Sequence, residues 1–144
     1  KMVFVGVSEG WRVAPQLAQA RIPVIASALN DLPATFEMLG ATQSNIGRMK
    51  DAGVQVAIGM INDRDAHQLR YTTQYAGNIV SLERVPGATG LTWDEAFAAI
   101  SSVPAEIMGV GDRFIIKLDH IHKKAWYLVP FDSFKFVICE NRLK

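Results

Sequence analysis

The sequence predicts an α/β fold organised around a parallel β-sheet. Three apolar, β-rich runs at residues 2–7, 22–29 and 54–59 are separated by segments with the apolar spacing of helices. This alternation of strand and helix favours parallel strands joined by right-handed crossovers. The 144-residue length and the 49% hydrophobic content fit one globular domain with a proper core.

The first elements follow directly from this pattern. The run "MVFVGV" at 2–7 predicts a strand that is buried on both faces. The helix expected over 8–21 has Ser8 as its N-cap, and Pro15 either kinks it or marks its true first turn. The run "IPVIASAL" at 22–29 predicts a second buried strand.

A loop of turn-forming residues, 30–43, comes after the second strand. Its side chains Phe36, Met38 and Leu39 are expected to anchor it locally.

The second helix is expected to begin after the cap residue Ser44 and to bury Ile46 and Met49. Gly53 occupies the position of a left-handed residue that ends a helix. The third strand, 54–59, follows at once.

Two further helical regions are expected in the second half. One begins at Asp65, which is expected to be its N-cap, and in the next Thr92 and Glu95 have the spacing of a capping box. A short helix then has Pro104 in its first turn and Gly109 near its end. The inner face of the helix from Asp65 is expected to carry Leu69, Thr72, Thr73, Ala76 and Val80.

The last part of the chain, 114–144, differs from the rest. Its short apolar or aromatic runs are separated by charged and turn residues, which predicts weak strands or a partly ordered extension.

Composition narrows the classes of partner. Fifteen basic against fourteen acidic side chains give no electrostatic case for nucleic acid or an anionic membrane, which leaves small molecules or proteins. The single cysteine, Cys139, excludes an internal disulfide framework and fits a reducing compartment. No apolar run approaches the roughly 20 residues that cross a bilayer, and no signal-peptide core is present, so a cytoplasmic location is expected.

Four segments in order carry a family resemblance. They are "SEGWRVAPQLAQARIPVIASALNDLPA", "NIGRMKDAGVQVAIG", "LRYTTQYAGN" and "GLTWDEAFAAISSVPAEIMGVGDR". Together they resemble the C-terminal third of the amidohydrolase superfamily, with its imidazolonepropionase-like branch as the closest match. The resemblance implies a partial TIM (β/α)8 barrel over 1–113, strands six to eight with their helices, followed by a divergent tail over 114–144.

The resemblance also implies a chemistry. Members of this superfamily are metal-dependent hydrolases that cleave C–N bonds of amides or cyclic amides. A divalent metal, expected to be zinc, is held by a His-x-His pair on the first strand, a carbamylated lysine or glutamate on the fourth, histidines on the fifth and sixth and an aspartate ending the eighth. Such an ion lowers the pKa of bound water, and a carboxylate beside that water can take its proton.

This chain departs from the family pattern at both ends of the resemblance. The sixth-strand run "VFVGV" lacks a histidine at its end, and Met60 and Ile61 follow "VAIG", so that Asp63 comes two residues beyond the usual position. After "GDR", the family's "GSL-x-PGK-x-ADLVVW" stretch is replaced by "FIIKLDHIHKKAWYLVPFDSFKF". The isolated chain is therefore expected to be inactive, because most ligands would come from strands outside it.

The candidate site lies in "MINDRDAHQLRY", after the third strand. Asp63 is the candidate catalytic carboxylate, or alternatively a loop residue near a helix N-terminus. The candidates for contact with a small-molecule substrate are Asn62, His67, Arg70 and Tyr71, which as solvated or packing residues would have no such role. The metal ligands of this chain stay unassigned.

Two other interpretations compete with the enzyme fragment. A half-barrel could be a non-catalytic binding or assembly module, because three strands cut from a barrel leave unpaired edges and an uncovered face that favour self-association or pairing with the missing portion. An independent flavodoxin-like domain has the right order of elements, but no Gly-rich phosphate loop follows its first strand.

Overall fold

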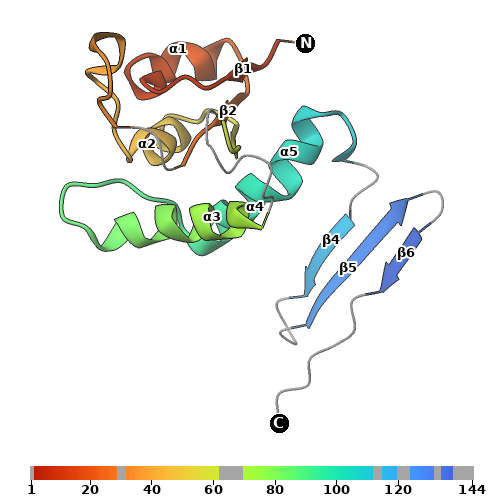
Figure 1. Ribbon diagram of the computed structural model, residues 1–144. Helices are drawn as coiled ribbons and strands as arrows, with labels where there is room; N and C mark the ends of the chain where they lie inside the picture. The colour runs from red at the N-terminus through yellow and green to blue at the C-terminus, as the bar shows by residue number, and fades with distance from the viewer. Residues whose placement is uncertain are drawn as a thin grey trace. The chain divides into compact units, whose positions relative to one another are not determined.

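The computed structural model describes residues 2–28, 32–61 and 70–111, together with the backbone of 115–119, 124–131 and 134–137. The chain divides into two compact units, residues 1–104 and 105–144. Figure 1 shows their elements. The division at residue 113 that the resemblance implies stays a prediction.

The first unit contains a three-stranded parallel sheet, as the sequence predicts. Its strands are β1 (Phe4–Val5), β2 (Val24–Ala26) and β3 (Val56–Ile58), in the order β1-β2-β3. Both pairs are parallel, and Val24 of β2 lies between Phe4 and Val56. The carboxyl ends of all three strands therefore lie at one edge of the sheet.

Helical segments connect these strands and follow the sheet. They are η1 (Gly10–Val13), α1 (Ala14–Gln19), η2 (Phe36–Met38), α2 (Asn45–Asp51), α3 (Tyr71–Ser81), η3 (Leu82–Arg84), α4 (Trp93–Ile100) and α5 (Ser102–Ile107). Helix α2 contacts η1, α1 and β3, whereas α3 packs against α4 and both contact β3. Within the described residues, no helix combines the length and apolar character that crossing a bilayer requires.

One face of the sheet forms the core with these helices. Val24 and Val56 from the strands join Ile46 and Met49 from α2 and Ile79 from α3, and each is at most 4% exposed. Side chains alternate between the two faces of a strand, so Ile25 and Ala57, which follow these valines along the strands, point to the other face, as does Val5, the partner of Ile25. The burial of Ile46 and Met49 confirms the predicted inner side of the second helix.

The edge strand β1 corrects one expectation. The sequence predicts burial of this run on both faces, but Phe4 is 38% exposed and Val5 is 61% exposed. The other edge strand, β3, also has one strand partner but is buried, because α2, α3 and α4 contact it, whereas β1 packs mainly against β2.

The first two helices begin where the sequence places them, but the predicted caps have other roles. Pro15 lies in the first turn of α1, whereas Glu9, and not Ser8, precedes η1. Ser44 precedes α2 without capping it, because its hydroxyl accepts a hydrogen bond from the Thr89 N–H at 3.0 Å. The local sequence does not reveal this role of Ser44, because its partner Thr89 lies 45 residues away.

Local signals further along the chain were more reliable. Gly53 ends α2 with φ of 86°, and Gly109 follows α5 with φ of 73°. The capping box of Thr92 and Glu95 is present with both of its hydrogen bonds.

The inner face of α3 differs in part from the prediction. Ala76 is buried as expected, but Thr73 is exposed, and the other buried side chains are Tyr75 and Ile79. The predicted start of this helix at Asp65, and Leu69 within it, lie outside the described residues.

The second unit contains an antiparallel sheet in the order β4-β5-β6. Its strands are β4 (Ile115–Asp119), β5 (Lys124–Phe131) and β6 (Phe134–Val137). The three apolar runs of the tail therefore form strands, which confirms the first of the two alternatives that the sequence left open.

Candidate functional site

The candidate site lies at the carboxyl edge of the parallel sheet. The segments that leave β1, β2 and β3 all start at this edge because the strands run in the same direction. Parallel sheets bind their ligands at this end of the strands. The described part of this edge consists of 6–9, 27–28 with 32–44, and 59–61.

The predicted site residues fall into two groups. Asn62, Asp63 and His67 lie outside the described residues. Arg70 and Tyr71 are described, and they lie together where α3 begins. The Arg70 guanidinium donates a hydrogen bond to the Tyr71 hydroxyl at 3.3 Å, and its central carbon is 5.0 Å from the centroid of the Tyr71 ring.

The residues on either side of the undescribed segment are tied to the fold. The Thr72 hydroxyl lies 3.5 Å from the Met60 sulfur, which links the first turn of α3 to the end of β3. The Gly59 N–H donates to the Ala26 carbonyl at 2.9 Å, so the sheet pairing continues past β3. Tyr71 is partly buried against the core. The segment that carries Asp63 therefore starts and ends at fixed points.

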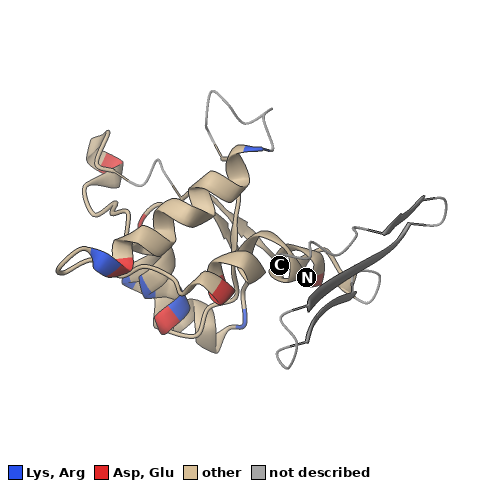
Figure 2. Ribbon diagram, turned by 90° about the horizontal axis from the view of Figure 1, so that it is seen from below, with Lys and Arg blue, Asp and Glu red and all other residues tan. Residues whose placement is uncertain are grey.

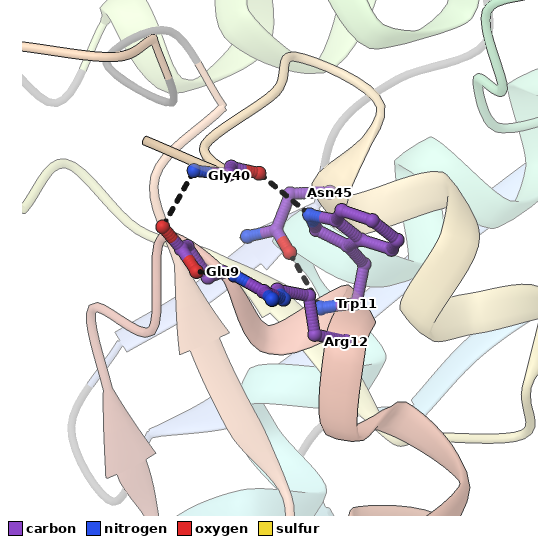
Figure 3. A network of polar contacts seen from close by, with 5 residues as sticks. All are labelled: Glu9, Trp11, Arg12, Gly40 and Asn45. Carbon is purple, nitrogen blue, oxygen red and sulfur yellow. Dashed lines mark hydrogen bonds and ion pairs between the residues drawn. The ribbon is translucent and has the colours of Figure 1, made fainter. Parts of the chain in front are cut away.

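A polar network at the same edge was not predicted from the sequence. It joins the turn after β1 to the loop between β2 and α2 (Figure 3). The Glu9 carboxylate accepts a hydrogen bond from the Gly40 N–H at 2.6 Å and one from Arg12 at 2.9 Å. The Trp11 indole N–H donates to the Gly40 carbonyl at 2.7 Å. The N–H and the carbonyl of Gly40 are thus both hydrogen-bonded to residues that follow β1.

Trp11 is a packing residue in this structure. The Arg48 guanidinium carbon lies 4.8 Å from the centroid of its ring, within the range of a cation–π contact. Its indole N–H is used by Gly40, and its backbone N–H is used by Asn45.

Asn45 fixes the turn from inside the protein. This side chain is 0% exposed; its oxygen accepts from the Trp11 backbone N–H at 3.0 Å and its nitrogen donates to the Val7 carbonyl at 2.9 Å. Val7 has φ of 55°, which is unfavourable for a β-branched residue. The amide of Asn45 therefore holds a strained turn in place.

These contacts set the charge of Glu9. The Gly40 N–H, and after it the Arg12 guanidinium, hold the pKa of Glu9 below its ordinary value of 4.5. This carboxylate therefore binds Gly40 and Arg12, and its bond to Gly40 fixes the loop between β2 and α2.

The described residues do not supply a metal site. Within them, no three His, Cys, Asp or Glu side chains lie close enough together to share an ion. The ligand set that the family resemblance implies does not fit the described strand ends, where the acidic residue of the turn after β1 is Glu9.

Comparison with known proteins gives two matches. No family model matches the chain. Amidohydrolase tasK from Hapsidospora irregularis is 30% identical over 122 residues, which cover 78% of this chain and 12% of the relative. The crystal structure of an amidohydrolase from Thermotoga maritima matches with a TM-score of 0.61 and 22% identity, covering 77% of this chain and 27% of that one.

Both of these proteins are amidohydrolases by name. The structural match shows the fold, a mixed α/β arrangement consistent with part of a barrel. This chain spans a small part of each amidohydrolase that it matches.

Sequence reasoning missed the Glu9, Gly40 and Asn45 network for a definite reason. Its hydrogen bonds connect residues 29 to 38 positions apart, which no local pattern reveals. Two residues of the sequence mark this network. Asn45 is the first residue of α2, and Gly40 lies in the loop before that helix. At Gly40 an added Cβ would lie 3.0 Å from the Glu9 carboxyl carbon, so the close approach favours glycine.

The lowered pKa of Glu9 predicts an acid-sensitive contribution to stability. Because the folded pKa is below the unfolded value of about 4.5, the contribution is fully present above that pH and is lost as the pH falls through the folded pKa. Glu9→Gln should therefore flatten the fall in the free energy of unfolding below pH 4.5, measured by urea denaturation at several pH values.

Glu37→Gln is the matched control, because the Thr35 hydroxyl lowers the pKa of Glu37 without involving Gly40. The Glu37→Gln variant should lose only the contribution of Glu37 to the pH dependence of the free energy of unfolding. Parallel curves for Glu9→Gln and the unchanged protein would show that the Glu9 contacts make no difference to folding.

Proposed function

We propose that this chain forms the C-terminal third of an amidohydrolase-type (β/α)8 barrel of the imidazolonepropionase-like branch. In this proposal β1, β2 and β3 are strands six, seven and eight. Complete barrels of this kind have eight parallel strands and about 250 residues. The order and parallel pairing of the three strands support the assignment.

The observation that carries the proposal is the second face of the sheet. Val5, Ile25 and Ala57 lie side by side across the three strands and alternate with the row that packs in the helical core. All three are apolar, and exposure rises across the row from 1% at Ala57 to 61% at Val5. Parallel sheets are normally covered on both faces, so this row fits the packed interior of a larger barrel.

The proposed reaction is hydrolysis of a C–N bond in an amide or cyclic amide by the complete barrel. In it, the Asp63 carboxylate accepts a proton from the water that attacks the amide carbon. Asn62, His67, Arg70 and Tyr71 are the proposed contacts to a small-molecule substrate. The divalent metal of the family, proposed to be zinc, would depend on ligands outside the described residues.

The surroundings of Arg70 support its proposed role. It directly precedes α3, a helix without charged side chains whose ribbon is tan along its length in Figure 2. A cation at a helix N-terminus is disfavoured by about 0.3–1 kcal/mol, because that end of the helix dipole is positive. The guanidinium and the helix N-terminus both attract a negatively charged or polarised oxygen, such as a substrate carboxylate or carbonyl.

A chimera tests the role of Asp63. The segment of the Thermotoga maritima amidohydrolase that matches this chain is replaced by residues 2–111, and hydrolysis of the parent's amide substrates is measured. In a monodisperse chimera, Asp63→Asn should reduce turnover roughly 10²–10⁴-fold, because a positioned general base contributes about that much.

Asp94→Asn, an exposed carboxylate in the first turn of α4, is the matched control and should leave the rate unchanged. Equal rates for the two variants would remove Asp63 from the reaction. The 144-residue chain alone is expected to show no turnover with added zinc; stoichiometric zinc together with turnover would contradict its proposed inactivity.

The free edge of β1 favours a second candidate function, a non-catalytic half-barrel that pairs with another chain. The N–H groups of Phe4 and Gly6 point to the second strand, where they bond to the carbonyls of Pro23 and Ile25. The intervening Val5 therefore directs its backbone groups to the opposite edge. Exposed apolar strand edges of this kind associate readily.

Sedimentation velocity tests this candidate. We expect the unchanged chain to associate with rising concentration and Val5→Lys to shift it to the monomer, because lysine on an edge strand blocks pairing. Val85→Lys changes a comparably exposed valine away from the sheet and should leave association unchanged. A single monomeric species at every concentration would rule out pairing through this edge.

A further inference from the structure

The segment 32–41, called the strap here, has few contacts that would hold it closed. It includes η2 and is folded locally, with hydrogen bonds from the Met38 N–H to the Thr35 carbonyl and from the Ala41 N–H to the Met38 carbonyl. Its large apolar side chains are mostly in solvent: Leu32 is 52% exposed, Phe36 88% and Leu39 66%. Phe36 and Leu39 are therefore not the anchors that the sequence predicts.

The strap is held instead through the two backbone groups of Gly40. Glu9 accepts from its N–H, and Trp11 donates to its carbonyl. These two residues are called the clamp here; Glu9 ends the turn that follows β1, and Trp11 lies in η1 (Figure 3). Beyond Gly40, the chain enters the core, where Ala41 is 6% exposed and Asn45 is 0% exposed.

The consequence is an uneven distribution of stability. The clamp itself stays fixed, because Asn45 binds the turn and Arg48 stacks on the Trp11 ring. Among the residues that the structure describes, the strap gains little from apolar burial, so its closed position depends mainly on the two hydrogen bonds to Gly40. Segments with few buried contacts open locally at a lower free energy than the whole fold.

We propose that the strap is a latch that opens as a unit when the clamp releases Gly40, while the sheet and helices α1 and α2 stay folded. Closed, the strap connects the carboxyl ends of β1 and β2. This opening does not rest on the proposed function.

Amide hydrogen exchange of the unchanged 144-residue chain gives the first test. The N–H groups of Met38, Gly40 and Ala41 should exchange through one shared opening, roughly tenfold or more faster than the Val54 N–H, which bonds to the Met49 carbonyl at the end of α2. Exchange of the Gly40 N–H only at the rate of Val54 would overturn the proposal.

Two variants then remove the two sides of the clamp separately. Glu9→Ala deletes the acceptor for the Gly40 N–H. Trp11→Phe deletes the indole donor but keeps a ring beneath Arg48. Each should raise exchange in the strap roughly tenfold or more and leave Val54 unchanged, because one hydrogen bond to Gly40 is lost.

Glu37→Ala is the matched control, since it removes a strap carboxylate that does not bind Gly40. It should leave exchange at Gly40 unchanged. Equal acceleration of Gly40 and Val54 in both clamp variants would show that the clamp supports the whole unit, and the latch would be rejected. No change in either variant would also reject it, whatever the outcome of the chimera.

Discussion

The described fold depends on the buried amide of Asn45. This side chain reaches from the start of α2 to the turn after β1, where it bonds to the Val7 carbonyl and to the Trp11 N–H. The left-handed backbone of Val7 costs about 1–2 kcal/mol for a residue with a Cβ. A turn of that kind persists only where its surroundings fix it, and Asn45 does so from a fully buried position.

Other features of the carboxyl edge follow from this turn. Because the turn is fixed, Glu9 and Trp11 both reach Gly40, and Arg48 packs on the indole ring. The long loop between β2 and α2 is therefore attached to the neighbouring strand exit. A single buried amide thus organises two of the three strand exits at the edge that carries the candidate site.

Much of the fold could be predicted from the sequence because the relevant signals are local. Apolar runs placed the three parallel strands, and Gly53 and the pair Thr92 and Glu95 placed helix ends, since each signal lies within the element that it marks. The exposure of β1 could not be predicted in this way, because burial of a strand depends on which helices pack on it, and α2, α3 and α4 contact β3 whereas β1 packs mainly against β2.

The candidate site was less predictable for the same reason. The partners of Glu9 and Asn45 come from distant parts of the chain, so no spacing rule reveals them. Of the residues proposed for chemistry, Arg70 and Tyr71 are in contact with each other, whereas Asn62, Asp63 and His67 lie outside the described residues. The comparisons match the chain to amidohydrolases, whereas the polar network alone points to no class of reaction.

The free energy of unfolding of Asn45→Ala tests the central claim most directly, with Asn78→Ala on the exposed side of α3 as the control. We expect urea denaturation, followed by tryptophan fluorescence, to show a loss of about 1–3 kcal/mol for Asn45→Ala relative to the control, because the partly buried Trp11 N–H loses its acceptor. A difference within about 0.5 kcal/mol would contradict the account, since that is the range of substitutions at ordinary surface positions.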